Sequence, residues 1–193
     1  MVFFKEKLAG YLFYYLLFFL STNLVFESIA HYLAYKKMGN YEVYNGEMIF
    51  EVSFFLLLYR RSFSSIKFKI ITTVFFMFFI LFAAINIAFF QPFTSFHSNT
   101  YTAGCLLLLV TSIFFLFNDI VKAEDLNPLF FPMFWISLGI LFCYLVNFPF
   151  LSNVNQLFII DDALAKRLSV INYTVNVILY LLIGIGIICK RQI

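Results

Sequence analysis

Three ionisable side chains interrupt the long apolar segments of this sequence, where polar groups are rare. They are Glu27, His31 and Glu51. Segments of about 20 apolar residues have the length that crosses a lipid bilayer. Because a charge in hydrocarbon is costly, each of the three is expected to face protein or water and to mark a candidate functional site.

Glu27 and His31 are four residues apart, so a helix would place them on one face. Three kinds of chemistry fit this spacing. One is a hydrogen bond that positions neighbouring helices. Another is a site that responds to protons or to a ligand, and the third is a metal site with Glu51 as an additional ligand. In each case we expect the three side chains to face one another in one half of the bundle, with Glu51 the deepest.

Amide side chains add further polar positions in the same apolar segments. Most of these amides are expected to hold helices together by hydrogen bonds. Those that share a half of the bundle with Glu51 are also candidates for a ligand- or proton-responsive site. The full candidate set is Glu27, His31, Glu51, Asn86, Asn147, Asn172 and Asn176.

The motifs of the common enzyme classes are missing from the sequence. There is no GxSxG, HExxH or GxGxxG motif, and a helix would point the adjacent carboxylates of Asp161 and Asp162 in different directions. Cys105, Cys143 and Cys189 lie far apart without a CxxC pair, so neither a disulfide framework nor a zinc site is predicted. We therefore predict no catalytic residues, no bound metal and no cofactor, and we do not expect an enzyme.

The composition is typical of a membrane protein. Of the 193 residues, 63% are hydrophobic and 12% are charged, against about 25% charged residues in soluble domains. The net charge of +3 comes from Lys and Arg at the ends of apolar segments, a pattern that reflects membrane topology. The expected partner of the surface is therefore the lipid bilayer, and nucleic acid is not an expected partner.

Six apolar segments predict an all-α fold, a polytopic integral membrane helix bundle with six transmembrane helices in a single domain, residues 1–193. Pro92 and Pro128 punctuate the pattern, because proline cannot continue a helix without a lost hydrogen bond. Gly184 and Gly186 are expected to let the last helix pack closely. The predicted spans are residues 8–30, 42–59, 70–90, 102–121, 129–150 and 168–189.

The basic residues predict the orientation of these spans. With six spans both termini lie on one side of the membrane, and that side collects nine of the 13 basic residues, whereas the other collects four. Positively charged loops favour the cytoplasm, so we predict a multi-pass protein of the bacterial inner (plasma) membrane with both termini cytoplasmic. The nine are Lys5, Lys7, Arg60, Arg61, Lys67, Lys69, Lys122, Lys190 and Arg191; the four are Lys36, Lys37, Lys166 and Arg167.

Two stretches carry a resemblance to a group of known proteins. Residues 128–150 read PLFFPMFWISLGILFCYLVNFPF, and residues 40–61 read NYEVYNGEMIFEVSFFLLLYRR, in which Glu51 precedes an apolar run. Glu27 fits as an acidic residue late in the preceding helix. These features resemble small bacterial seven-span membrane proteins that look like free-standing relatives of the membrane sensor regions of histidine kinases. This chain departs from the group in having one predicted span, rather than two, before Lys36 and Lys37.

The first function hypothesis is a sensory or signal-coupling membrane module with an outward-facing polar pocket, acting through a signalling partner in the membrane or the cytoplasm. The alternatives are a small transporter or proton-coupled carrier that uses Glu27 and Glu51, and a structural subunit of a membrane complex. Carriers usually show broken helices and internal repeats at the bilayer midplane. Neither feature is evident in the sequence.

Overall fold

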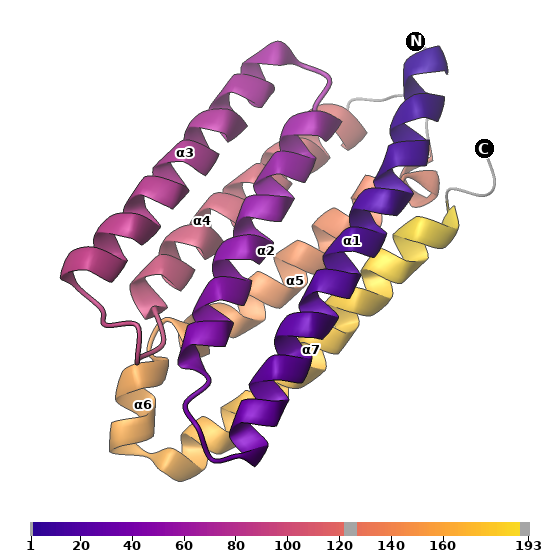
Figure 1. Cartoon of the computed structure of the whole chain (residues 1–193). Helices are drawn as coiled ribbons and strands as arrows, with labels where there is room; N and C mark the ends of the chain where they lie inside the picture. The colour runs from indigo at the N-terminus through magenta and orange to yellow at the C-terminus, as the bar shows by residue number, and fades with distance from the viewer. Residues whose placement is uncertain (1, 122–126, 190–193) are drawn as a thin grey trace.

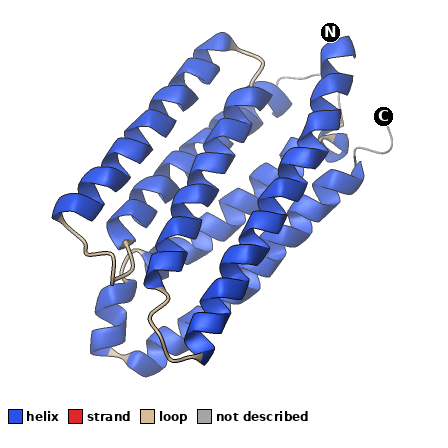
Figure 2. Cartoon of the chain, in the orientation of Figure 1, coloured by secondary structure: helices blue, strands red, loops and turns tan. Residues whose placement is uncertain are grey.

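Six long helices and three short ones make up the described part of the chain, residues 2–121 and 127–189 of a computed structural model. These residues contain no strand (Figure 2), so the predicted all-α bundle is confirmed. The short elements are the π-helix η1 directly after α4, the 3-10 helix η2 before α5, and α6. The elements are α1 (Val2–Tyr35), α2 (Tyr41–Ser62), α3 (Ile66–Phe89), α4 (Ser98–Phe115), η1 (Leu116–Val121), η2 (Pro128–Phe130), α5 (Pro132–Leu151), α6 (Val154–Ile160) and α7 (Asp162–Cys189).

Successive long helices run in opposite directions, so the bundle has two distinct ends (Figure 1). The terminal end is the one where α1 begins and α7 finishes. The other, the α6 end, carries the short helix α6 and the connections 36–40 and 90–97. This alternation places the first and last described residues on the same side of the bundle, as the six-segment pattern requires.

Five helices among the described residues are long and apolar enough to cross a membrane. They confirm the first, third, fourth, fifth and sixth predicted spans, although α7 begins at Asp162 rather than at Leu168. The chain is therefore an integral membrane protein. The five membrane-spanning segments are Tyr11–Tyr35, Ile66–Phe89, Ser98–Val121, Pro132–Leu151 and Ala163–Cys189.

The second predicted span, α2, is long enough to cross a membrane but does not meet the same criterion of apolarity. It has 22 residues and carries Glu42, Glu47, Glu51, Arg60 and Arg61. In the bundle it packs against α1, α3 and α4, and one of its faces is buried along almost the whole helix. Because protein covers that face, α2 does not need the apolar surface that a lipid-exposed helix needs.

The core of the terminal half is largely apolar, and a cluster of hydroxyl groups from three helices lies within it. Tyr59 of α2 is fully buried; its hydroxyl donates a hydrogen bond to Ser137 Oγ of α5 at 2.9 Å and lies 2.8 Å from Ser112 Oγ of α4. Interhelical hydrogen bonds of this kind hold membrane helices together where lipid removes the hydrophobic drive. The cluster fixes α2 against α4 and α5.

Close backbone contact between α5 and α7 depends on one of the two glycines of the last helix. A Cβ atom at Gly186 would lie 2.9 Å from the carbonyl oxygen of Pro132, whereas a Cβ atom at Gly184 would have nothing within 4 Å. The sequence-based expectation of close packing is thus confirmed for Gly186 and wrong for Gly184. The carbonyl of Pro132 is main chain, so it cannot turn aside as a side chain would.

We predict that Gly186→Ala destabilises the bundle, because the added methyl group forces α5 and α7 apart at Pro132. Overpacking of this kind costs about 1–3 kcal/mol. The expected result is a lower thermal unfolding midpoint of the purified protein in detergent. Gly184→Ala, two residues away on the same helix, is the matched control and should leave the midpoint unchanged. Equal losses in the two variants would contradict the close contact.

Candidate functional site

A cavity of about 290 Å³ lies in the half of the bundle nearer the α6 end. Residues of α1, α2, α4, α5, α6 and α7 form its walls, so six helices converge on it. The lining is rich in carboxyl, hydroxyl and amide groups, in contrast to the apolar terminal half. The polar lining residues are Glu27, Asn40, Tyr41, Tyr44, Glu47, Glu51, Tyr101, Cys143, Tyr144, Asn147, Ser169, Asn172, Tyr173, Asn176 and Tyr180.

One face of α2 brings two carboxyl groups to the cavity. Glu47 and Glu51 are one helical turn apart, and Tyr44 lies on the same face one turn before Glu47. Glu47 is only 8% exposed, and Glu51 is partly exposed to the cavity. Glu27 reaches the cavity from α1 and lies close enough to act electrostatically on both. No Lys or Arg lines the cavity within the described residues, so no basic side chain there balances a negative charge on these carboxyl groups.

The opposite wall is a chain of hydrogen bonds between α5 and α7. Asn147 Nδ2 donates to Cys143 Sγ at 3.5 Å, and Cys143 Sγ donates to Asn176 Oδ1 at 3.2 Å. The hydroxyl of Tyr144 lies within hydrogen-bonding reach of the Glu51 carboxyl across the cavity. Asn172 Oδ1 is buried without a hydrogen-bond donor. Because α5 and α7 are the most extensively packed pair of helices, this wall is held rigidly.

The connection 90–97 closes the α6 end of the bundle beside the cavity and supplies Phe96 to its wall. Asn45 of α2 holds this connection, donating to Ser95 O at 2.9 Å and accepting from the backbone N–H of His97 at 2.9 Å. Asn155 of α6 donates to Phe96 O at 2.7 Å. Burial of the imidazole lowers the pKa of His97, so the neutral ring is favoured in this connection.

Five of the seven candidate residues line the cavity: Glu27, Glu51, Asn147, Asn172 and Asn176. The sequence-based expectation that Glu27 and Glu51 share one site agrees with this placement. Whether these residues respond to a ligand or a proton stays a prediction.

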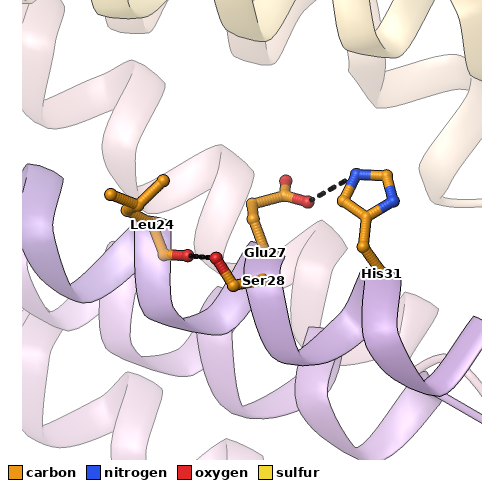
Figure 3. A network of polar contacts seen from close by, with 4 residues as sticks. All are labelled: Leu24, Glu27, Ser28 and His31. Carbon is orange, nitrogen blue, oxygen red and sulfur yellow. Dashed lines mark hydrogen bonds and ion pairs between the residues drawn. The ribbon is translucent and has the colours of Figure 1, made fainter.

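His31 does not line the cavity, so the expectation that it faces Glu51 is wrong. Its side chain is 72% exposed, and its Nε2 lies 3.9 Å from Oε2 of Glu27 one turn earlier on α1 (Figure 3). The same stretch of α1 carries a hydrogen bond from Ser28 Oγ to Leu24 O at 2.6 Å. The side chain of His31 extends to the outside because the inward face of α1 at this depth is taken by Glu27 and Ala30.

Asn86 also lies away from the cavity, in a separate cluster that joins α3 to α4. Its Nδ2 donates to Thr100 Oγ1 at 3.0 Å and to Gln91 Oε1 at 2.9 Å. Its Oδ1 accepts a weaker bond of 3.3 Å from Asn99. Asn86 is 2% exposed, and all its contacts are structural. It therefore serves the role of helix positioning that was expected for most of the amides.

Sequence reasoning missed Glu47 and most of the tyrosines that line the cavity. Glu47 lay inside the predicted second span, residues 42–59, but was not singled out, although the spacing of Tyr44, Glu47 and Glu51 places all three on one helical face. Asn172, Asn176 and Tyr180 repeat every fourth residue along α7 in the same way. Following the helical period along these two predicted spans would have found them.

Comparison with models of known protein families, with curated proteins and with solved structures gave no match. Among the described residues, no group of three or more His, Cys, Asp or Glu side chains is arranged to hold a metal ion.

We predict that Asn86→Ala lowers the stability of the protein without changing the cavity. The substitution removes the hydrogen bond to the buried hydroxyl of Thr100 on α4, at a cost of about 1–3 kcal/mol. A thermal unfolding scan of the purified protein measures this loss. Asn99→Ala removes only the 3.3 Å bond of an exposed side chain and should cost much less. A loss as large for Asn99→Ala would count against a central role for Asn86.

Proposed function

We propose that this protein is a sensory or signal-coupling membrane module that binds a small ligand in the cavity at its α6 end. The single observation that carries the proposal is a polar cavity built by six helices in the half of the bundle nearer the α6 end. Pockets of a few hundred cubic ångströms with convergent polar groups are the usual form of ligand sites.

The terminal half of the bundle closes the cavity on the side that faces away from the α6 end. One or two turns beyond the lining residues, α2, α4, α5 and α7 each carry a fully buried apolar side chain, and these side chains belong to one hydrophobic cluster. A ligand that enters from the α6 end therefore meets a closed floor, which favours binding over passage. The side chains of this apolar layer are Leu56, Leu108, Ile136, Ile140 and Ile183.

Helix α2 connects the cavity with the terminal end. It carries Glu47 and Glu51 at one end and Tyr59 near the other, and it leads into the connection 63–65. There the backbone N–H of Ser64 donates to Asp119 Oδ1 at 2.8 Å, within the π-helical segment η1. Segments of π-helix are frequent at functional sites. A shift of α2 on ligand binding would therefore alter contacts at the terminal end.

A structural change at the terminal end can act as a signal only if another protein detects it. We propose a separate signalling partner in the membrane or the cytoplasm, in agreement with the resemblance of residues 40–61 and 128–150 to the sensor regions of histidine kinases.

The carboxyl groups of Glu27, Glu47 and Glu51 favour a second candidate function, a proton-coupled or cation carrier. A carrier would have to open the apolar layer, and flux measurements separate it from a sensor.

The proposed location is the inner membrane with both termini cytoplasmic, so that the cavity opens away from the cytoplasm. We predict that a cysteine at Met38, an exposed residue of the connection 36–40, reacts with a membrane-impermeant maleimide in intact spheroplasts. A cysteine at Ser65, exposed at the terminal end, should react only after the membrane is permeabilised. The unsubstituted protein gives the background of the native cysteines. The reverse order of labelling would overturn the orientation.

Coupling can be tested by filling the cavity covalently. Tyr173 lines the cavity and is 48% exposed, so Tyr173→Cys can be modified with benzyl methanethiosulfonate. We expect amide hydrogen exchange at residues 63–65 and 116–121 to change by at least about fivefold, the low end of typical coupling energies. The full-length protein in lipid nanodiscs is the material, and exchange is read by mass spectrometry.

The matched control is Ser28→Cys, modified with the same reagent on the exposed face of α1 outside the cavity. It should leave exchange at the terminal end unchanged. Exchange that stays constant at the terminal end with the cavity filled would contradict a signal-coupling role. Accumulation of a cation inside proteoliposomes would instead favour the carrier.

A further inference from the structure

Two hydrogen-bonding groups that remain unused in the cavity are acceptors. Glu47 is 8% exposed, lines the cavity and has no hydrogen bond or ion pair with any residue in the described part of the chain. Asn172 Oδ1 is buried there without a donor. A buried acceptor without a donor costs free energy. These two groups, on opposite walls, would be satisfied by a ligand that carries N–H or O–H donors.

The charged groups of the lining also favour a positively charged ligand. Glu47 and Glu51 lie one turn apart and repel each other, and no basic side chain among the described residues lines the cavity to balance them. Glu27 differs from these two because it lies 3.9 Å from His31. A cation between Glu47 and Glu51 would replace repulsion by attraction inside a site of low dielectric constant.

Aromatic rings provide much of the remaining surface. Tyr101 and Tyr144 stack with their ring centroids 6.1 Å apart and their planes at 13°, and Tyr44, Tyr173 and Tyr180 are among the other aromatic side chains of the lining. Tyrosine faces attract cations and also accept an apolar body. The lining therefore suits a ligand with one charged end and one apolar end.

The dimensions favour a polyatomic cation over a metal ion. Ca²⁺ binds six to eight oxygen atoms at about 2.3–2.6 Å, whereas no group of three or more His, Cys, Asp or Glu side chains among the described residues is arranged to hold a metal ion. A cavity of about 290 Å³ holds a small organic molecule.

We infer that the ligand of this cavity is a small organic ammonium ion, whose N–H groups are held by Glu47, Glu51 and Asn172 and whose apolar part lies among the tyrosine rings. The inference rests on the proposed function, since it names the class of ligand for the same cavity. It also assigns Glu47 as the principal binding residue and Glu51 as a second carboxylate that attracts the same cation.

The test compares two probes of the same shape that differ in charge. The purified full chain in nanodiscs is titrated with 2-phenylethylammonium chloride and with neutral 2-phenylethanol by isothermal titration calorimetry. The ammonium ion should bind at least about tenfold more tightly, because a buried charge pair contributes at least that much. Equal affinity of the two probes, or tighter binding of the anion 3-phenylpropionate, would overturn the inference.

Isosteric substitutions locate the site. Glu47→Gln and Glu51→Gln should each weaken binding of 2-phenylethylammonium by about tenfold or more. Glu42→Gln is the matched control, because Glu42 is an exposed carboxylate of the same helix outside the cavity, and it should leave affinity unchanged. Should a variant fail to fold, the comparison of the two probes on the native protein still decides the question. Undiminished binding in both folded cavity variants would overturn the assignment.

The outcomes also separate the inference from the proposed function. Absence of binding by both probes, together with a change of hydrogen exchange in modified Tyr173→Cys, would reject the ammonium ligand and leave the sensory role supported. Absence of both effects would reject both proposals. Binding of 2-phenylethylammonium without any change at the terminal end would support the ligand class and reject signal coupling.

Discussion

The carboxyl groups of Glu47 and Glu51 impose the strongest constraint on this bundle. A charged side chain turned toward the hydrocarbon core costs about 2.5–3.5 kcal/mol on insertion scales, so α2 cannot present this face to lipid. The other helices enclose it, and α2 becomes an interior element whose face is buried along its length. The exposed apolar side chains of α1, α3 and α7 then form the surface that meets the bilayer.

Enclosing α2 also divides the bundle into two chemically different halves. Near the α6 end the helices diverge around carboxyl, amide and phenol groups and leave a cavity of about 290 Å³. Toward the terminal end the same helices pack largely through fully buried apolar side chains, together with the Tyr59 hydroxyl cluster. Helix α2 belongs to both halves and carries Glu47 and Glu51 in one and Tyr59 in the other. This continuity is the structural basis for proposing that events in the cavity reach the terminal end.

The close packing of the helices depends on small residues as well as on apolar ones. A Cβ atom at Gly104 would lie 2.8 Å from Val52 and 3.0 Å from Phe79, so α4 approaches both α2 and α3 closely at this point. Gly186 plays the same part between α7 and α5. Lipid is as apolar as the helix surfaces, so close packing and hydrogen bonds, rather than the hydrophobic effect, hold such helices together. The clusters around Tyr59 and Asn86 supply the hydrogen bonds.

The sequence by itself determined the helices of this protein and much of its candidate site. Length and apolarity defined five spans, the prolines marked helix ends, and the cost of polar groups in lipid directed Glu27, Glu51, Asn147, Asn172 and Asn176 inward. The tertiary structure decided the rest. It brought Glu47 and the tyrosines into the same cavity, turned His31 outward and placed Asn86 in a separate cluster. The physical reason is that helical periodicity fixes which residues share a face, whereas the rotation of that face is set by packing against neighbours that are distant in the sequence.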